Sequence, residues 1–249
     1  MERVNFMKIS IVSCSRNNEK YLKQHIESVQ SQTYTNFEHI IIDDASTDSS
    51  LDLIRQYCNP SNTIAIARKV RVSSSINHIT AFKILTGDLV IHLDGDDYFY
   101  DSGVLDYIVS KYKETDCWAT YGSWVHAPSS RHTFTMGKHP TGKVEDIRNP
   151  RIGWNFTHLR TFKKNLISAI PAMDLFNREG ELYLTAPDVV LLTGIYEYAS
   201  KFNKVLYIDK PLVVYNSDTG SNEMDLYAQD QTNTMIEVFS SPFSIIKLL

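Results

Sequence analysis

The 249-residue sequence lacks the features that mark membrane proteins and disulfide-rich proteins. No apolar run approaches the roughly 20 residues of a membrane-spanning helix, and the first residues lack the apolar core of a signal peptide. Cysteines are few: Cys14, Cys58 and Cys117 form no C-x-x-C pair and no even set. This argues against a disulfide framework or a cysteine-based zinc site, so we expect a protein of a reducing compartment, the cytoplasm.

An excess of basic residues is also missing. Lys and Arg total 25 against 29 Asp and Glu, a formal net charge of -4. Nucleic acid is held mainly by positive charge, so nothing in this balance recommends it as a partner. The C-terminal residues 242–249 are apolar, with Lys247 as their one charged side chain. We expect this tail to pack on the core or to form a homodimer contact rather than to bind a membrane.

Apolar patterns alternate between strand and helix through the first half of the chain. With 43% hydrophobic residues, the chain can build one large core. Buried-strand patterns occur at 8–14 and 89–93, and further strand patterns at 37–42 and 63–67. Helical patterns follow the first three strands at 18–31, around 51–57 and at 76–85. This alternation predicts an α/β fold with a largely parallel sheet covered by helices.

The second half is less regular. Its patterns predict helices at 101–112, 157–170 and 185–200, and strands at 117–121, 124–125, 205–208 and 212–215. Between them, residues 128–153 are rich in Pro, Gly, Ser and Arg and show little periodicity. Such a stretch is either a mobile loop over a site or an ordered substrate loop.

A cluster of acids follows the strand predicted at 89–93. Asp94, Asp96 and Asp97 come directly after this apolar run, and in extended backbone Asp94 and Asp96 point the same way. Gly95 lets the chain turn and leaves backbone open to a ligand. Like charges held this close repel one another, and a divalent cation relieves the repulsion. The pattern indicates a metal site for a phosphate-bearing substrate, with an ordinary Asp-Gly turn as the alternative.

A second strand also ends in acids. Asp43 and Asp44 follow the strand at 37–42. In parallel sheets, ligands bind beyond the carboxyl ends of the strands, where both acidic clusters would lie. Two acid-tipped strands in one crevice therefore favour a binding site, although acidic helix caps remain the alternative for Asp43.

Several linked motifs lie at Ser10–Val12, Asn17–Leu22, Ile26–Tyr34, Asn36–Glu38, Ile42–Ser49 and Leu93–Asp97. Together they resemble family 2 glycosyltransferases of the GT-A fold. The resemblance implies a single GT-A domain over 1–249, with a Rossmann-like mixed sheet, a nucleotide-sugar-binding half at 1–100 and an acceptor-binding half at 101–249. It also implies a nucleoside-diphosphate sugar as donor, with UDP as the first nucleotide to test. A divalent Mn²⁺ or Mg²⁺ ion and inversion at the anomeric carbon are further implications. The acceptor would be a hydroxyl of a glycan, a glycolipid or a protein.

The resemblance assigns roles to individual residues. Asp44 would contact the nucleotide base, Asp94 the ribose, and Ser13 would also line the donor site. In the Asp-x-Asp motif, Asp96 would bind the metal, with Asp97 as a metal ligand able to exchange roles with it. Base preference stays open, because residues 69–75 replace a Gly-rich segment that often holds the nucleotide in this family.

Inversion requires a base on the acceptor side, and the resemblance places it at Asp188, at the start of a predicted helix. It would take the proton of the acceptor hydroxyl. The partner acid that the family usually has just before it is replaced here by Pro187. A helix-start acid favoured by the dipole is the structural alternative, and Glu197 is the alternative base. Of the three tryptophans, Trp154 is the expected acceptor platform.

Two other functions share these features. A nucleotidyltransferase that makes nucleotide sugars would also use strand-end acids and a metal, but no Gly-rich, Lys- or Arg-bearing loop for a triphosphate follows the first strand. A catalytically silent binding module would keep the fold and the donor pocket without transfer. The intact acids argue against that module.

Overall fold

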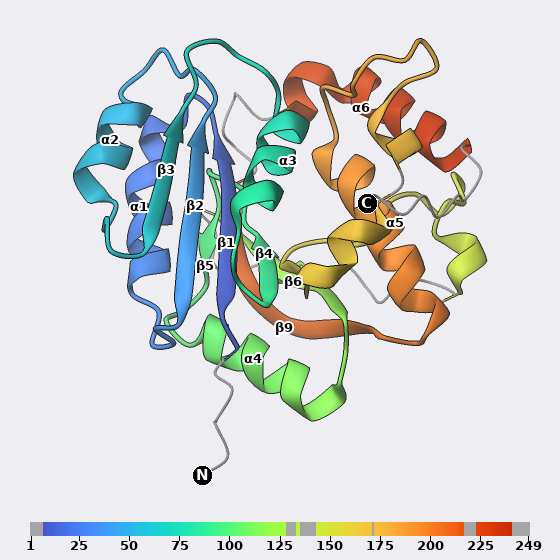
Figure 1. Cartoon of the computed structure of the whole chain (residues 1–249), viewed down its shortest axis with the longest axis horizontal. Coiled ribbons are helices and arrows are strands. Elements are labelled where there is room, and N and C mark those ends of the chain that lie inside the picture. The colour runs from blue at the N-terminus through green and yellow to red at the C-terminus, as the bar shows by residue number, and fades with distance from the viewer. Residues whose placement is uncertain (1–6, 128–132, 135–142, 171, 217–222, 241–249) are drawn as a thin grey trace.

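The computed structural model describes residues 7–127, 133–134, 143–170, 172–216 and 223–240. Within them, nine strands form one sheet in the order β3-β2-β1-β4-β8-β6-β9-β5, with β7 paired to β6 (Figure 1). The parallel part confirms the four strands expected in the first half of the chain. It consists of β1 (Ile9–Ser15), β2 (Phe37–Asp43), β3 (Thr63–Ala67) and β4 (Leu89–His92).

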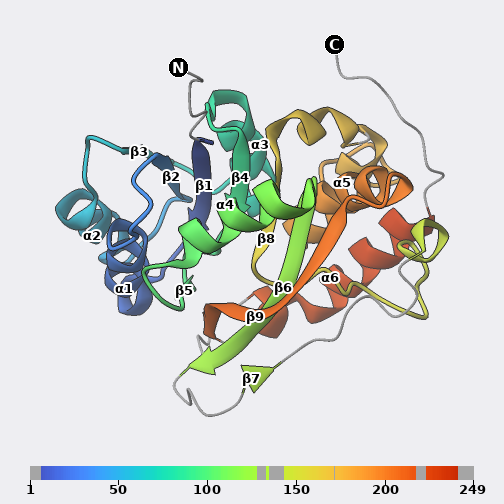
Figure 2. The same cartoon turned by 90° about the horizontal axis from the view of Figure 1, so that it is seen from below.

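Antiparallel neighbours complete the sheet and make it mixed. Strand β8 lies antiparallel between β4 and β6, which joins the two halves of the chain in one sheet. Strands β6 and β9 run parallel, side by side in Figure 2. The remaining strands are β5 (Tyr98–Phe99), β6 (Ala119–Ala127), β7 (Thr133–Phe134), β8 (Arg160–Lys163) and β9 (Val205–Asn216).

Helices cover both faces of the sheet. The first face carries α1 (Glu19–Gln30), α2 (Ser50–Tyr57) and α4 (Val104–Thr115). The other face carries α3 (Ser74–Ile84) and α5 (Pro187–Lys201), and α6 (Glu223–Ser240) packs on α5. Short 3-10 helices connect these elements: η1 (Val144–Asp146), η2 (Lys164–Ala169) and η3 (Ala172–Leu175).

Alternating side chains explain the two layers. Along β1, Ile9 and Ile11 belong to the core cluster that includes α4, whereas Val12 belongs to the cluster that includes α5. All three side chains are fully buried. The period of two in a strand therefore supplies both cores from one continuous apolar run, which is typical of a sheet covered on both faces.

The helix expected at 157–170 is wrong. Residues Arg160–Lys163 form strand β8, and Lys164–Ala169 form η2. The spacing of Leu159, Phe162 and Leu166 fits a helix, but Phe162 is fully buried where β8 pairs with β4 and β6. Pairing with two neighbouring strands outweighs the local pattern.

The strand pairs expected at 117–125 and 205–215 are also wrong in number. Each pair is one continuous strand, β6 and β9. Their register shifts on either side of Ser123, which lies opposite Pro211. A bulge accommodates a proline that cannot donate to the ladder, so the strand continues through it.

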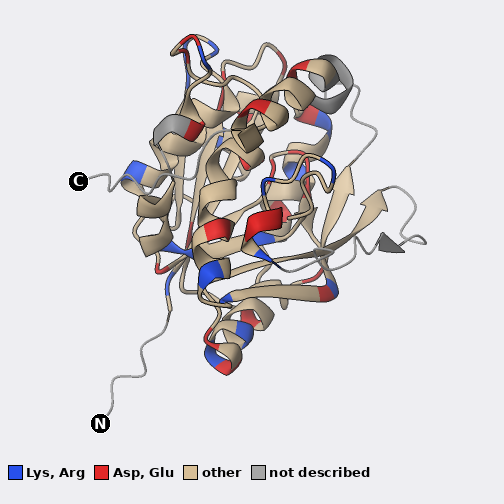
Figure 3. Ribbon diagram, turned by 90° about the vertical axis from the view of Figure 1, so that its right-hand side faces the viewer, with Lys and Arg blue, Asp and Glu red and all other residues tan. Residues whose placement is uncertain are grey.

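Charged residues of both signs are interspersed over the ribbon in Figure 3, as the net charge suggests. No helix among the described residues combines the length and apolar character needed to cross a membrane. The apolar tail 242–249 lies outside the described residues, as do 128–132 and 135–142 of the expected loop.

Candidate active site

The acids after β4 lie on a tight turn rather than on extended backbone. The N–H of Asp97 donates to the carbonyl of Asp94 at 3.0 Å, which closes a β-turn. Gly95 is required by close packing, because a Cβ there would lie 2.7 Å from the carbonyl oxygen of Cys14. The turn brings together the side chains of Asp94 and Asp97, a pairing that extended backbone does not predict.

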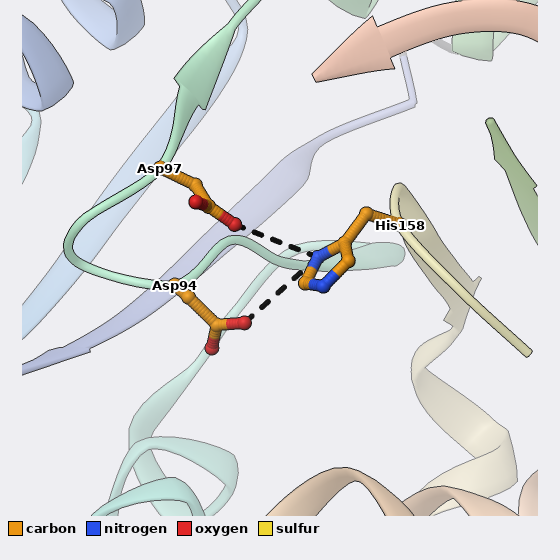
Figure 4. Close-up of side chains that lie close together, drawn as sticks. All are labelled: Asp94, Asp97 and His158. Carbon is orange, nitrogen blue, oxygen red and sulfur yellow. Dashed lines mark ion pairs between the residues drawn. The ribbon is translucent and has the colours of Figure 1, made fainter. Parts of the chain in front are cut away.

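Asp94, Asp97 and His158 form a group that can hold a metal ion. One ligand atom from each lies within 4.8 Å of the others, and Figure 4 shows both carboxylates directed toward the imidazole. Nδ1 of His158 is 3.8 Å from Oδ2 of Asp94 and 3.7 Å from Oδ2 of Asp97. Asp97 is fully buried, and its Oδ2 has no hydrogen-bond partner among the described residues. A buried carboxylate oxygen without a partner fits a metal ligand.

The two carboxylates of this group prefer opposite protonation states. Burial, and then the nearby carboxylates of Asp96 and Asp94, raise the pKa of Asp97 well above its usual range. Burial would also raise the pKa of Asp94, but His92 and Arg160 lower it well below its usual range. A bound cation would favour the ionised form of both carboxylates.

Two buried histidines, His92 and His25, contact the turn. Nε2 of His92 lies 2.9 Å from Oδ1 of Asp94, and Nδ1 of His25 lies 2.7 Å from the carbonyl oxygen of Asp97. Burial lowers the pKa of His25 to about 4, so its imidazole is neutral at neutral pH and donates a single N–H to that carbonyl. These contacts fix the turn before any ligand binds.

Asp188, the predicted base, lies beside Arg160, which is not among the site residues predicted from the sequence. Asp188 stands in the first turn of α5, and its Oδ2 is 3.5 Å from Nη2 of Arg160. The same nitrogen lies 4.0 Å from Oδ2 of Asp94 and 2.9 Å from Nε2 of His158. Arg160 thus connects the acidic turn to the start of α5. Its role depends on the placement of strand β8 beside β4, which the local sequence pattern does not show.

The two other predicted donor residues are Asp44, which follows β2, and Ser13, in β1. Asp44, at the same edge of the sheet, accepts the N–H groups of Val72 and Ser73 at 2.9 and 3.2 Å, so it holds the loop before α3. Ser73 has φ of 120°, a conformation that favours glycine, in the segment that replaces the Gly-rich stretch. Ser13 is fully buried, with its hydroxyl 3.1 Å from Nε2 of His39.

Comparison with known proteins decides the family. The family model described as "Glycosyl transferase family 2" matches residues 10–181, more than half of the chain. The chain belongs to glycosyl transferase family 2. This match includes the acidic turn, His158 and Arg160, and it ends before Asp188.

Among the curated relatives of this family 2 chain, some match only a part of its length and others nearly all of it. Glycosyltransferase GlyG of Streptococcus pneumoniae is 25% identical over 258 residues, which cover 95% of this chain and 79% of GlyG. Putative glycosyltransferase EpsE of Bacillus subtilis is 38% identical over 94 residues. That match covers 36% of this chain and 33% of EpsE, so the chain spans well under two thirds of that relative.

Solved structures give the fold of this family 2 chain. TarS of Staphylococcus aureus, residues 1–349 with UDP-GlcNAc, matches 96% of the chain and 68% of its own, with a TM-score of 0.70 and 18% identity. Glucosyl-3-phosphoglycerate synthase of Mycobacterium tuberculosis, with Mn²⁺, UDP and glucosyl-3-phosphoglycerate, matches 96% of the chain and 82% of its own. Its TM-score is 0.62 at 13% identity. The fold is therefore a single α/β domain of GT-A type.

The alternative base of this family 2 chain is not available for catalysis. Glu197 is buried, and both its oxygens accept from the guanidinium of Arg148 at 2.6 and 2.9 Å. Asp174 makes a second two-point pair with the same guanidinium. A carboxylate held in this way is a structural anchor between α5 and its neighbours.

The tryptophans of this family 2 chain lie in different surroundings. Trp154, the expected acceptor platform, packs against the rings of Phe156 and Tyr196, with centroids 5.2 and 6.0 Å away. Trp124 instead lies 6.1 Å from the ring of His158. Among the three tryptophans, Trp124 is the one in contact with the metal-capable group.

Proposed function

We propose that the chain is an inverting, metal-dependent glycosyltransferase that moves a sugar from a nucleoside-diphosphate sugar to a hydroxyl of a glycan, a glycolipid or a protein. The observation that carries the proposal is the meeting of two groups from distant parts of the chain. Asp94, Asp97 and His158 form one group, and Nη2 of Arg160 lies 4.0 Å from Asp94 in that group and 3.5 Å from Asp188. A donor site and an acceptor-side carboxylate therefore adjoin, as sugar transfer requires.

The metal-capable group fits Mn²⁺ or Mg²⁺. Two carboxylate oxygens are ligands that both ions accept, and an imidazole nitrogen suits Mn²⁺ better than Mg²⁺. Burial lowers the pKa of His158 well below its usual range, and Arg160 adds to that effect, so the imidazole is neutral. Because Nε2 accepts from Arg160, Nδ1 carries the proton here, and binding of a metal at Nδ1 would require that proton to move to Nε2 and the hydrogen bond from Arg160 to break. When bound, the cation would supply positive charge to the leaving diphosphate. We place Asp94, Asp97 and His158 in this role, and Asp96 at the rim of the group.

Asp188 takes the acceptor-side role in this proposal. Its carboxylate accepts the proton of the acceptor hydroxyl as that oxygen attacks the anomeric carbon from the face opposite the diphosphate. One displacement on that face inverts the anomeric centre. Asp188 is partly exposed at the first turn of α5, where an acceptor can reach it.

A UDP-sugar is the proposed donor. TarS is solved with UDP-GlcNAc, and the mycobacterial synthase with UDP and Mn²⁺. Asp44 is the proposed contact for the base, since it follows β2 at the same sheet edge as the acidic turn. Ser13, in β1, stays a proposed donor-site residue. Residues 1–100 would bind the donor, and 101–249 would supply the acceptor side. Cys14, Cys58 and Cys117 form no disulfide, which supports the cytoplasm as the place of action.

The experiment is a transfer assay with wild type and Asp188→Asn. Purified protein is incubated with Mn²⁺, a series of UDP-sugars and a panel of hydroxyl acceptors, and product anomers are read by NMR. We expect an inverted product, and a loss of kcat of about 10²- to 10⁴-fold in Asp188→Asn with UDP binding retained. Release of pyrophosphate from a nucleoside triphosphate would favour a nucleotidyltransferase. Binding without turnover would favour a silent module.

A further inference from the structure

Arg160 is a buried cation surrounded by acids from both sides of the site. Its residue surface is 4% exposed, and its single Nη2 lies within 4.0 Å of both Asp94 and Asp188. Burial would lower the pKa of this guanidinium, but Asp188 and Asp94 raise it above its ordinary value. A buried charge is retained where opposite charges hold it, so the two carboxylates and the arginine form one electrostatic unit.

The guanidinium of Arg160 lies closer to His158 than to either carboxylate. Nη2 of Arg160 approaches the carboxylates only to 3.5 and 4.0 Å, yet donates to Nε2 of His158 at 2.9 Å. Nε of Arg160 is buried and has no hydrogen-bond partner among the described residues. The guanidinium is therefore not saturated in the way that Arg148 is, which makes two two-point pairs. Arg148 serves as a structural anchor, whereas Arg160 lies where charge changes during a reaction.

We infer that Arg160 is a positioning residue that holds Asp188 beside the donor site by screening it from Asp94. Without a cation between them, the carboxylates of Asp94 and Asp188 would repel each other, and the diphosphate of a donor would add to that repulsion. The inference rests on the proposed function, because it concerns the base and the metal group assigned there. It adds Arg160 to the residues of the site, and it states in which direction replacing Arg160 changes the Mn²⁺ affinity.

The direction in which Mn²⁺ affinity changes separates a positioning residue from one that only keeps the site folded. The charge of Arg160 lies close to a carboxylate of the metal-capable group, so it opposes a second cation there. Removing that charge should tighten Mn²⁺ binding to the protein without nucleotide, while it loosens Asp188 and slows transfer. A residue that only keeps the site folded would weaken Mn²⁺ binding when it is replaced.

The variants are chosen to separate charge from shape. Arg160→Met removes the charge and keeps an apolar side chain of comparable length. Arg160→Lys keeps the charge but cannot reach both carboxylates with one planar group. Lys163→Met is the matched control, because Lys163 lies on the same strand β8 and pairs with Asp116 at 3.3 Å, away from the site.

The experiment measures Mn²⁺ affinity by calorimetry without nucleotide, and then kcat and KM for the donor. In Arg160→Met we expect Mn²⁺ to bind about three- to tenfold more tightly, and kcat to fall by about 10²-fold with the donor KM close to wild type. Arg160→Lys should keep the wild-type Mn²⁺ affinity with a smaller loss of kcat. Lys163→Met should change neither quantity.

The outcomes distinguish this inference from the proposed function. If the wild type binds Mn²⁺ and transfers sugar, but Mn²⁺ affinity in folded Arg160→Met is unchanged or weaker, the inference is overturned and the proposed function stands. If Arg160→Met does not fold, Arg160→Lys decides: a kcat equal to wild type overturns the inference, and a partial loss at unchanged Mn²⁺ affinity supports it. If the wild type binds no Mn²⁺, both fail.

Discussion

The backbone N–H of Asn216 donates to Oδ1 of Asp97 at 2.9 Å, although the two residues are 119 positions apart in the chain. The side-chain amide of Asn216 also donates to the carbonyl of Asp96. Asn216 is the last residue of β9, and the turn that it contacts follows β4. The far end of the sheet therefore braces the turn that carries the metal-capable carboxylates.

Asn216→Ala tests this brace. The variant keeps the backbone bond and loses the amide bond to Asp96, and a net hydrogen bond is worth about 1 kcal/mol, so Mn²⁺-dependent UDP affinity should fall about fivefold. The exposed Asn165→Ala on η2 is the control and should leave it unchanged. Calorimetry of UDP with Mn²⁺ measures both variants. Equal affinities in Asn216→Ala and wild type would show that the turn holds its shape without the amide.

Glu197 and Arg148 allow a prediction that separates stability from activity. Arg148→Met leaves Glu197 and Asp174 buried without their partner, so the free energy of unfolding should fall by about 4 kcal/mol. Glu197→Gln should also unfold more easily, yet its kcat per folded molecule should stay near wild type, because Glu197 does not reach the site. Urea denaturation and the transfer assay measure the two quantities. A large loss of kcat in folded Glu197→Gln would restore it as the base and remove Asp188 from that role.

Much of the fold follows from the sequence because the decisive pattern is local. Continuous apolar runs such as Ile40–Ile42 predict strands buried on both faces, and β1, β2 and β4 are where those runs lie, whereas β3 is a partly exposed edge strand. Strand β8 could not be predicted in this way. Residues 157–170 carry a helical spacing, and only pairing with β4, some 70 residues earlier, makes Arg160–Lys163 a strand. Register between distant segments is set by packing, which a single window of sequence does not contain.

The candidate site, like the fold, is predictable from the sequence only where the pattern is local. Asp97 and Asp188 are visible in the sequence, because each stands at the end of a recognisable element. The closeness of Asp94 to Asp97 depends on a turn, which the hydrogen bond from Asp97 to Asp94 closes. Arg160 depends on β8, and so its role could not be seen until that strand was placed.

Glu38 predicts how stability depends on pH. Its carboxylate accepts from Lys8, Ser10 and Thr86 at 2.6 to 2.9 Å, across the start of β1, β2 and β4. Burial would raise the pKa of Glu38, but these hydrogen bonds lower it to about 2 from the usual 4.5. Since the folded-state pKa is the lower one, the stabilisation is complete above pH 4.5 and is lost as pH falls toward 2.

Glu38→Gln should therefore lower the free energy of unfolding by about 2 kcal/mol at pH 7. The difference from wild type should shrink as pH falls below 4.5. Urea denaturation at pH 7, and again at about pH 3, measures it. Glu27→Gln is the control, because Glu27 is exposed and pairs with Lys23 at 3.8 Å on the surface of α1. A difference that is the same at both pH values would contradict the assignment of this pKa.

The metal-dependent donor site is tested by calorimetric titration of UDP into wild type, His158→Ala and Asp188→Asn, each with Mn²⁺ or with EDTA. We expect Mn²⁺ to strengthen UDP binding at least about tenfold in wild type and in Asp188→Asn, and His158→Ala to lose most of this gain. Asp188→Asn serves as the control, since Asp188 is outside the ligand group. Equal UDP affinity with Mn²⁺ and with EDTA in the wild type would contradict a metal-dependent donor site at Asp94, Asp97 and His158.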